Sequence, residues 1–530
     1  MHERIIAAGP SNDKSLRRSD WPCTVRRFGF LSLGGLVRTV AGALYDDWGG
    51  RAPERRPMIF NSLTFLVFFA MVMALHYAPF FSWHQKKINL LIASYLFYAA
   101  WNPPFVALLW ISTVVDWWAA QWMVRAKRER TRRMWMLTSV VVNLGMLGYF
   151  KYGGFLLDNF VTVAGSLGII YHPPGWDIIL PVGISFYTFA TLSYTLDVYL
   201  RRSAPAGSFL NYALFVTFFP HLVAGPIMRP TELVPQFEKP RQAKPNQIFF
   251  GLALLTLGMF QKVVLADGFL APVVEAVYDA HGKVPGMLDS WVATLAFAGQ
   301  IFCDFAGYST SAIGVALCMG FAMPDNFRFP YGAVGFSDFW RRWHITLSSW
   351  LRDYLYIPLG GNRHGQGRTY MALMGTMLLG GLWHGANWTF VVWGGLHGAY
   401  LSVERWLRSR FKGVTPGRLS MLGLALLTFI LVNITWVFFR AKTFAGAGVI
   451  LKGMAGMQVK PAPLIAAGPM IIAMVIVSTI FGTHLAMRNT TLEAVVERTP
   501  PVAIASIWTL LLFAVIIEQG QGSAFIYFAF

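Results

Sequence analysis

The chain has 530 residues, of which 55% are hydrophobic and only 13% are charged, whereas soluble domains carry roughly 25% charged residues. Its mean hydropathy of +0.49 excludes an ordinary soluble globular protein. Lysine and arginine outnumber the acidic residues and give a formal net charge of +19. Membrane proteins collect such cations in cytoplasmic loops, so the charge does not indicate nucleic-acid binding.

Residues 1–57 differ from the rest of the chain because they are polar and rich in arginine. Their one apolar run, at 28–45, is interrupted by Arg38 and lacks a signal-peptide core and cleavage site. A basic tail outside the membrane would also oppose the positive-inside tendency. We therefore predict that translation starts at Met58; the alternative is a translated, disordered tail.

Apolar stretches follow one another along 58–530. A spanning helix needs about 20 mostly apolar residues, so the pattern predicts an all-α, polytopic membrane domain with roughly 11 to 13 spanning helices. The basic runs at 125–133 and 404–412 predict cytoplasmic loops. The candidate spans are 59–79, 88–101 with 103–124, 134–160, 177–200, 208–228, 247–274, 288–320, 369–401, 419–439, 464–486 and 502–518.

The densest group of polar side chains is interleaved with apolar residues whose periodicity predicts one helix over 338–356. Tryptophan and leucine recur on one face, whereas Arg341, Arg342 and Arg352 fall largely elsewhere. Such a helix is too polar to span a bilayer comfortably, so it lies either in the membrane interface or along a wet cavity inside the protein. His344 on this helix is either a structural histidine or a functional one, and the residues alone leave both open.

A second histidine, His384, stands inside the apolar stretch 369–401. Ionisable groups at membrane depth are costly and usually face a cavity, and an imidazole with an ordinary pKa of about 6.5 exchanges protons at working pH. In a continuous helix Asn387 lies at i+3 on about the same face, where it orients the imidazole or a substrate carbonyl. Three interpretations stay open from the residues alone: a catalytic base, a packing histidine, and a proton-relay residue of a transporter.

Other chemistries find no support in the sequence. The three cysteines show no CxxC or metal-ligand spacing, so we predict neither a disulfide framework nor a zinc site. The chain holds no GxSxG motif, so we expect no activated serine. We expect no metal to be required.

Two long segments resemble the signature blocks of membrane-bound O-acyltransferases, most closely those of the bacterial alginate O-acetyltransferase branch. They are FWRRWHITLSSWLRDYLYIPLGGNR at 339–363 and GGLWHGANWTFVVWGGLHG at 380–398. The chain departs from this branch at His221, where glutamine is more usual, and at Thr310, where an acidic residue often stands. Shorter matches, which extend the resemblance over 58–530 and leave 1–57 outside it, lie at 93–105, 180–199, 218–230, 300–309 and 525–530.

The resemblance implies a helical, bowl-like membrane fold with a central tunnel. It also implies that His384 is the catalytic histidine and His344 its functional partner, with Asn387 helping to position the thioester carbonyl or the acceptor. Four arginines would meet the phosphates of the donor, because guanidinium groups pair well with phosphate; the alternative is ordinary interface charge. These arginines are Arg341, Arg342, Arg352 and Arg363.

The implied activity is O-acetylation. An acetyl group from a cytoplasmic thioester, expected to be acetyl-CoA, crosses the bacterial inner membrane and reaches an extracytoplasmic polysaccharide such as alginate. Periplasmic or membrane-anchored acetyltransferases and a polysaccharide biosynthesis complex are the expected partners, and no permanently bound cofactor is expected. The alternatives are an acyltransferase of the same family acting on peptidoglycan or a teichoic-acid carrier, and a transporter whose polar residues line a solute path.

Overall fold

The computed structural model of this chain describes residues 58–518 except 59, 61, 174, 176, 177, 281, 412 and 414–416. The basic segment 1–57 and the terminal match at 525–530 lie outside the described residues. The domain boundary and the translation start at Met58 therefore stay predictions.

Within the described residues the regular structure is helical, apart from one isolated bridge between Pro285 and Ala462. Six helical segments are long and apolar enough to span a membrane, and three shorter helices are also apolar. The prediction of an all-α, polytopic membrane protein is confirmed, while the spans predicted beyond these six stay predictions. The six segments are Pro103–Arg125, Glu129–Ser166, Pro245–Tyr278, Met287–Cys318, Arg418–Arg440 and Ala467–Met487.

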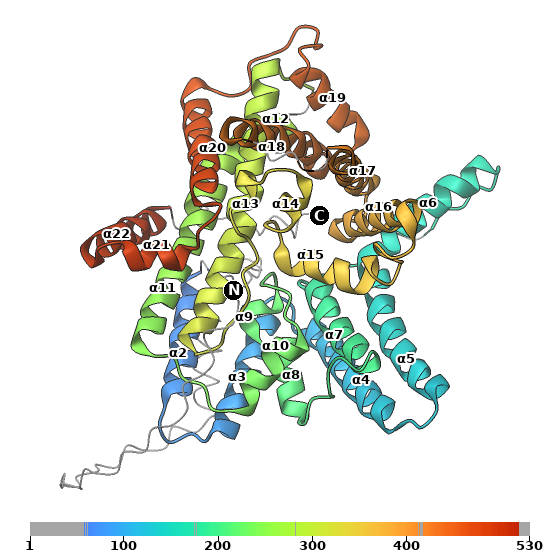
Figure 1. The fold of residues 1–530 in the computed structure, drawn as a ribbon, viewed down its shortest axis with the longest axis vertical. Coiled ribbons are helices and arrows are strands. Elements are labelled where there is room, and N and C mark those ends of the chain that lie inside the picture. The colour runs from blue at the N-terminus through green and yellow to red at the C-terminus, as the bar shows by residue number, and fades with distance from the viewer. Residues whose placement is uncertain are drawn as a thin grey trace, which may run out of the picture. The chain divides into compact units, whose positions relative to one another are not determined.

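Figure 1 labels the α-helices. Three further elements, η2, η3 and η5, are π-helical and continue neighbouring α-helices. In chain order the elements are α2 (Leu63–Tyr77), α3 (Trp83–Ala99), η1 (Pro103–Phe105), α4 (Val106–Arg125), α5 (Glu129–Leu147), η2 (Gly148–Tyr152), α6 (Gly153–Ser166), α7 (Ile184–Tyr199), α8 (Phe209–Thr217), α9 (Phe219–Leu222), α10 (Pro230–Glu238), α11 (Pro245–Met259), η3 (Phe260–Leu270), α12 (Ala271–Tyr278), α13 (Met287–Cys318), η4 (Pro330–Gly332), α14 (Phe336–Trp340), α15 (Ile345–Leu351), η5 (Arg352–Tyr356), α16 (Gly365–His384), α17 (Trp388–Arg410), α18 (Arg418–Arg440), α19 (Phe444–Met454), α20 (Ala467–Met487), α21 (Leu492–Arg498) and α22 (Pro501–Ile517).

The predicted helix over 338–356 is wrong, because the chain breaks at His344. Helix α14 ends at Trp340, and α15 begins at Ile345. His344 has φ +42° and ψ 56°, a left-handed conformation that an L-residue adopts singly and that a right-handed helix does not continue through. Apolar residues keep their helical spacing on both sides of the break, so the periodicity hides it.

Helix α13 forms the packing centre of the described chain. In its most apolar window 83% of the residues are buried, and it packs against α11, η3, α12, α18, α19 and α20 (Figure 1). A Cβ atom added to Gly258 of α11 or to Gly314 of α13 would collide with backbone atoms of the opposite helix. Glycine on both helices therefore lets their backbones touch, as small residues do in membrane helix pairs.

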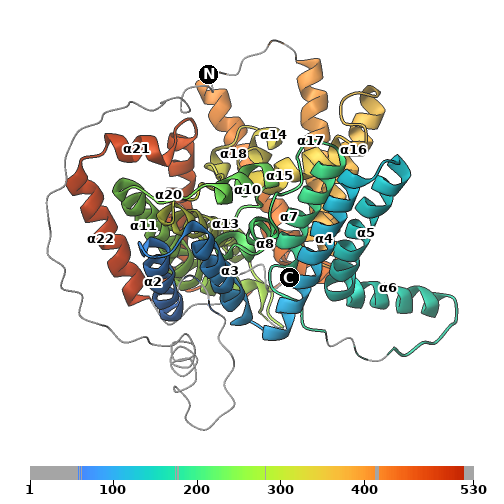
Figure 2. The same cartoon turned by 90° about the horizontal axis from the view of Figure 1, so that it is seen from below.

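Helices α4, α5 and α7 form a second group around a buried carboxylate (Figure 2). Asp116 of α4 accepts hydrogen bonds from Ser139 Oγ at 2.6 Å and from Asn143 Nδ2 at 2.9 and 3.0 Å, both on α5. Ser139 in turn lies 2.8 Å from the hydroxyl of Thr195 on α7. Polar groups at membrane depth must be satisfied within the protein, so this network ties α5 to its neighbours and fixes the helix that leads to η2.

Candidate active site

His384 is the last residue of α16. Its side chain is 3% exposed, and its ring lies 4.8 Å from the ring of Trp383, 4.9 Å from that of Trp393 and 5.3 Å from that of Phe439. Edge-to-face contacts of this kind restrict the rotation of a ring. The imidazole therefore sits in an aromatic enclosure built by the ends of three helices, α16, α17 and α18.

The stretch 369–401 is not one continuous helix, because the chain leaves α16 directly after His384. Gly385 has extended backbone angles, φ −158° and ψ 149°, and a Cβ there would collide with the ring of Phe390. Asn387 then caps α17 by accepting a hydrogen bond from the Thr389 backbone N–H at 3.0 Å. The expectation that Asn387 lies on the same helical face as His384 is wrong, since the helix ends between them.

The amide of Asn387 also donates from Nδ2 to the carbonyl oxygen of Lys442 at 3.0 Å. Its oxygen and its nitrogen are thus both used in holding the α16–α17 turn against the start of α19. This arrangement is typical of a helix cap. The residue still lines the cavity described below.

The carbonyl end of α16 is held by η2. Lys151 Nζ donates to the carbonyl oxygens of Trp383 at 2.6 Å and His384 at 3.2 Å, and Tyr152 Oη donates to that of Leu382 at 3.0 Å. The last carbonyls of a helix have no intrahelical partner and carry partial negative charge. A cation and a hydroxyl therefore satisfy this end, and they fix the backbone that carries the His384 ring.

His344 is fully buried at the break between α14 and α15. Its Nδ1 lies 3.1 Å from Asn326 Oδ1, which also accepts hydrogen bonds from the backbone N–H and the hydroxyl of Thr346. A backbone N–H can only donate, so the Asn326 atom is the oxygen and His344 Nδ1 carries the proton. Nε2 therefore bears the lone pair, and it has no hydrogen-bond partner among the described residues.

The structure brings His344 and His384 to the same indole. The ring centroid of Trp383 lies 6.1 Å from that of His344 and 4.8 Å from that of His384. Two buried imidazoles, one at the end of α16 and one at the break between α14 and α15, thus converge on one aromatic side chain. A left-handed, buried, non-glycine residue costs about 1–3 kcal/mol and is found most often at functional sites, which marks His344 in particular.

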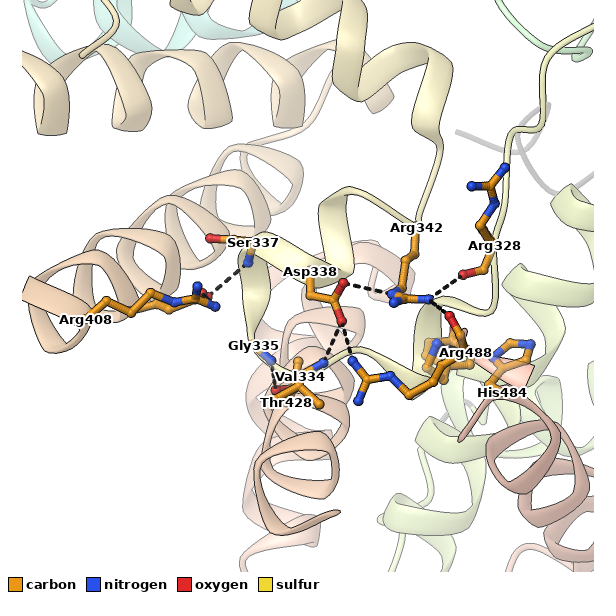
Figure 3. Close-up of polar contacts among 12 residues, drawn as sticks. Arg328, Val334, Gly335, Ser337, Asp338, Arg342, Arg408, Thr428, His484 and Arg488 are labelled. Atoms are coloured by element: carbon orange, nitrogen blue, oxygen red, sulfur yellow. Dashed lines mark hydrogen bonds and ion pairs between the residues drawn. The ribbon is translucent and has the colours of Figure 1, made fainter. Parts of the chain in front are cut away.

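The four predicted phosphate-binding arginines do not gather at this point. Arg342 is held by Asp338 at 2.9 Å and donates to the carbonyl oxygens of Arg328 and Arg488 (Figure 3). Its guanidinium therefore fastens the segment that precedes His344 to the end of α20. The other three, of which Arg352 pairs with its neighbour Asp353, are exposed: Arg341, Arg352 and Arg363.

A cavity of about 530 Å³ lies beside the end of α16. It shares Lys151 and Phe439 with the surroundings of His384, and Asn387 also lines it. The sequence argument missed most of its charged lining, although each of these groups is an ionisable residue within or at the end of an apolar stretch, which is itself a signal of function. The lining residues with polar side chains are Lys151, Lys262, Asp267, Glu275, Gln300, Asp304, Asn387, Thr389, Arg440 and Lys442.

Comparison with known proteins identifies the family of this chain. Residues 200–441 match the model of the MBOAT, membrane-bound O-acyltransferase family, which contains both histidines. The chain is 41% identical over 403 residues to the probable alginate O-acetylase AlgI of Pseudomonas aeruginosa, covering 75% of each protein. It is 37% identical over 434 residues to the peptidoglycan O-acetyltransferase of Helicobacter pylori, covering 76% of this chain and 80% of that protein.

A more distant relative is the teichoic acid D-alanyltransferase of Bacillus subtilis, with 27% identity over 293 residues, 52% of this chain and 72% of that protein. The three names describe transfer of an acyl group to alginate, to peptidoglycan and to teichoic acid respectively. The residues that match the family model, 200–441, include the two blocks that carry His344 and His384. The chain belongs to the membrane-bound O-acyltransferase family, and it is an acyltransferase.

Proposed function

We propose that this protein is an O-acetyltransferase of the bacterial inner membrane. It takes acetyl from a cytoplasmic thioester donor, acetyl-CoA, and delivers it for O-acetylation of an extracytoplasmic polysaccharide such as alginate. The similarity to AlgI proteins at 41% identity supports this assignment over the peptidoglycan and teichoic-acid alternatives, whose relatives match at 37% and 27%. Periplasmic or membrane-anchored acetyltransferases are the proposed partners for the final transfer.

The chemistry needs a base for the acceptor hydroxyl. His384 takes the hydroxyl proton, the hydroxyl oxygen bonds to the acetyl carbon, and the carbon–sulfur bond breaks; the proton then passes to the leaving thiolate. His344 Nε2, which bears a lone pair, accepts a hydrogen bond from a second hydroxyl or N–H of the acceptor and so positions it. The burial of both rings supports these roles, because excluding water limits hydrolysis of the thioester.

The directions of three helices support an outward transfer. Helix α5 begins within the basic segment 125–133 and leads to Lys151, while α17 begins beside His384 and ends within the basic segment 404–412. Helix α18 likewise ends at the cavity. If both basic segments are cytoplasmic, the cavity lies toward the opposite, outer end.

The donor enters from the cytoplasmic end in this proposal. Arg341 and Arg363 are exposed and are available for the donor's phosphates. Arg352 is also exposed, but it would have to exchange its partner Asp353 for a phosphate. Arg342 keeps its structural partners. It affects donor binding only indirectly, by holding the segment that precedes His344 against the end of α20. Asn387 acts as a helix cap and contacts the acceptor side of the site.

The deciding experiment compares wild type, a deletion and His384→Ala, with the exposed His84→Ala as the matched control. Ester-linked acetate on secreted polysaccharide is measured by NMR at equal membrane levels of protein. Removing a general base costs roughly 10²- to 10⁴-fold in rate, so we expect the deletion and His384→Ala to lose the acetate and His84→Ala to keep it. Acetate retained by the deletion would overturn the polysaccharide assignment and favour another acceptor or a transporter.

A further inference from the structure

Helices α5, η2 and α6 form one continuous helical segment, Glu129–Ser166, which is longer than a membrane is thick. Its 38 residues would reach about 57 Å at a rise of 1.5 Å per residue, whereas the hydrocarbon core of a bilayer is about 30 Å thick. The apolar part of α5 together with η2, residues 134–152, already covers about 28 Å at this rise. Helix α6 therefore begins where the membrane-spanning part of the segment ends.

At this point the segment changes direction. Helix α6 leaves the line of α5 and points away from the other helices (Figure 2). The bend coincides with η2, and π-helical turns are a known cause of bends in long helices. Trp388, at the start of α17, holds the first half of α6: its Nε1 donates to Asn159 Oδ1 at 2.8 Å, and its ring lies 5.7 Å from that of Phe155. Helix α6 is thus tied to the turn that follows His384 but extends beyond it.

The far side of α6 carries an apolar stripe that no described residue covers. Within this helix, whose residues are all described, only Ala164 is buried. The apolar stripe has four members, each at least 59% exposed and spaced three or four residues apart: Leu156, Phe160, Val163 and Leu167. Such spacing places side chains on one face of a helix. Asp158 and Thr162 are also exposed, and they lie on the opposite face.

The helical segment itself indicates what covers the apolar stripe. The membrane-spanning part has a similar row of exposed apolar side chains, Met134, Leu137, Val141 and Leu144, which face lipid in a protein that crosses the bilayer. The apolar stripe continues this lipid-facing row beyond the bend. A helix with one apolar and one polar face, placed at the end of a membrane span, is typical of helices that lie in the membrane interface.

We propose that α6 lies flat in the outer interface of the membrane, with the apolar stripe among the lipid acyl chains and Asp158 and Thr162 in water. Helix α5 begins in the basic segment 125–133, which is cytoplasmic by its charge, so α6 lies on the outer side. The helix contains one acidic residue and no lysine or arginine. Its binding energy therefore comes from apolar burial and not from attraction to anionic headgroups.

This placement has a consequence for the site. The π-helix η2 joins α6 to the membrane-spanning part, and its Lys151 and Tyr152 hold the end of α16. An α6 embedded in lipid fixes the height of η2, and with it the end of α16, relative to the membrane surface. The inference goes beyond the proposed function and does not depend on which group is transferred.

The test measures how spin labels on α6 meet water and lipid in the full-length protein in nanodiscs. Labels are attached to Phe160→Cys and Val163→Cys in the apolar stripe. The matched controls are Asp158→Cys and Thr162→Cys, on the same helix but on its opposite face. Electron paramagnetic resonance gives the collision rates of each label with a water-soluble nickel chelate and with oxygen, which concentrates in lipid.

Two conditions make the comparison specific. All variants carry Cys23→Ser, so that the remaining native cysteines are Cys303 and Cys318, which are buried; the Cys23→Ser protein without an introduced cysteine is the labelling blank. The nanodiscs contain phosphatidylcholine, either alone or mixed with phosphatidylglycerol. The purified sample holds no partner protein, so only lipid can cover the apolar stripe.

An interfacial helix places its apolar face about 5–10 Å into the boundary between headgroups and acyl chains, so labels on the apolar stripe should meet the nickel chelate at least about threefold less often than the label on Thr162→Cys. The same pattern is expected in both kinds of nanodisc. Equal collision rates at all four positions would overturn the proposal and leave the apolar stripe to a protein partner. Protection of all four positions, or protection only with phosphatidylglycerol, would overturn it as well.

The side of the membrane is tested in cells whose outer membrane has been permeabilised. A thiol reagent that cannot cross the inner membrane should label Thr162→Cys in these cells. Labelling that requires a broken inner membrane would place α6 on the cytoplasmic side and overturn the outer assignment. Neither experiment measures acetate, so failure of the proposed function, which is read from His384→Ala, is distinguished from failure of this inference.

Discussion

Lys151 and Trp383 are separated by 232 positions in the chain, yet the ammonium of Lys151 lies 2.6 Å from the carbonyl oxygen of Trp383. The same ammonium reaches the carbonyl oxygen of His384. Helix α16 therefore ends at a fixed point that is set by η2, a different part of the chain. The position of the His384 ring depends on that point.

Replacing Lys151 with methionine removes the charge and the three hydrogen bonds that its ammonium donates, to Trp383, His384 and Ser185, while keeping an apolar stem of similar length. We expect kcat to fall roughly 10- to 100-fold, because small displacements of a catalytic group are costly, with little change in KM for acetyl-CoA. Tyr152→Phe removes one hydrogen bond from the same helix end and serves as the control. If both variants lose turnover equally, Lys151 acts only as a generic cap.

The lone pair on His344 Nε2 predicts that the rate of acyl transfer depends on which nitrogen of His344 carries the proton. Asn326→Leu removes the acceptor that holds the proton on Nδ1, so we expect acyl transfer to fall roughly tenfold or more. Asn326→Asp keeps an oxygen acceptor and should recover part of that loss. The measurement is turnover at matched protein levels over a pH series, and an unchanged rate in Asn326→Leu would contradict the assigned role.

Gly385 permits the exit from α16 because the ring of Phe390 occupies the place of a Cβ atom. We expect Gly385→Ala to destabilise the protein by about 1–3 kcal/mol, as overpacking does, and to lower turnover by shifting His384. Gly145 on α5 has no atom near its Cβ position, so Gly145→Ala should be neutral or stabilise by up to about 1 kcal/mol. Thermal unfolding in detergent compares the two.

Asp279 lies outside the membrane-spanning segments and gives a pH-dependent prediction. Burial alone would raise the pKa of its carboxyl, but the hydrogen bonds and charges of Arg440 and Lys442 outweigh burial and lower the pKa below its usual range. A lowered pKa stabilises the folded state above the unfolded pKa of about 3.9, and this stabilisation is lost as pH falls through the folded pKa.

Asp279→Asn should therefore lower Tm by roughly 1–2 °C at pH 7, since partly exposed ion pairs contribute little. Below the unfolded pKa of about 3.9, as falling pH protonates the folded carboxylate, the difference from wild type should shrink. A difference that persists unchanged at the lowest pH would mean that the pair with Arg440 and Lys442 is not its source.

Much of the fold follows from the sequence because apolar composition and basic loops restrict a chain to membrane helices. His344 and His384 could also be found, since each sits in a long motif. The backbone conformation of these two motifs could not be predicted. The helical spacing of apolar residues continues across both His344 and Gly385. It therefore does not predict that a single left-handed or extended residue ends the helix at these positions.

The supporting residues were missed for a related reason. Lys151 and Asn326 lie outside the two signature blocks and gain their roles only through packing. Lys151 did carry a signal, being a lone lysine inside the apolar stretch 134–160. Asn326 carried none, since an asparagine in a loop is ordinary until its oxygen is found beside an imidazole.

The glycine contacts between α11 and α13 have a mechanical consequence. Carriers that work by alternating access rock or gate one group of helices against another. Here Gly258 and Gly314 bring two backbones into direct contact, and the ion pair between Lys262 and Asp304 ties the adjoining π-helix to α13. Sliding these helices past each other would break close packing and separate buried charges. The contact between α11 and α13 is therefore a rigid part of the fold, which disfavours a mechanism in which these two helices rock against each other.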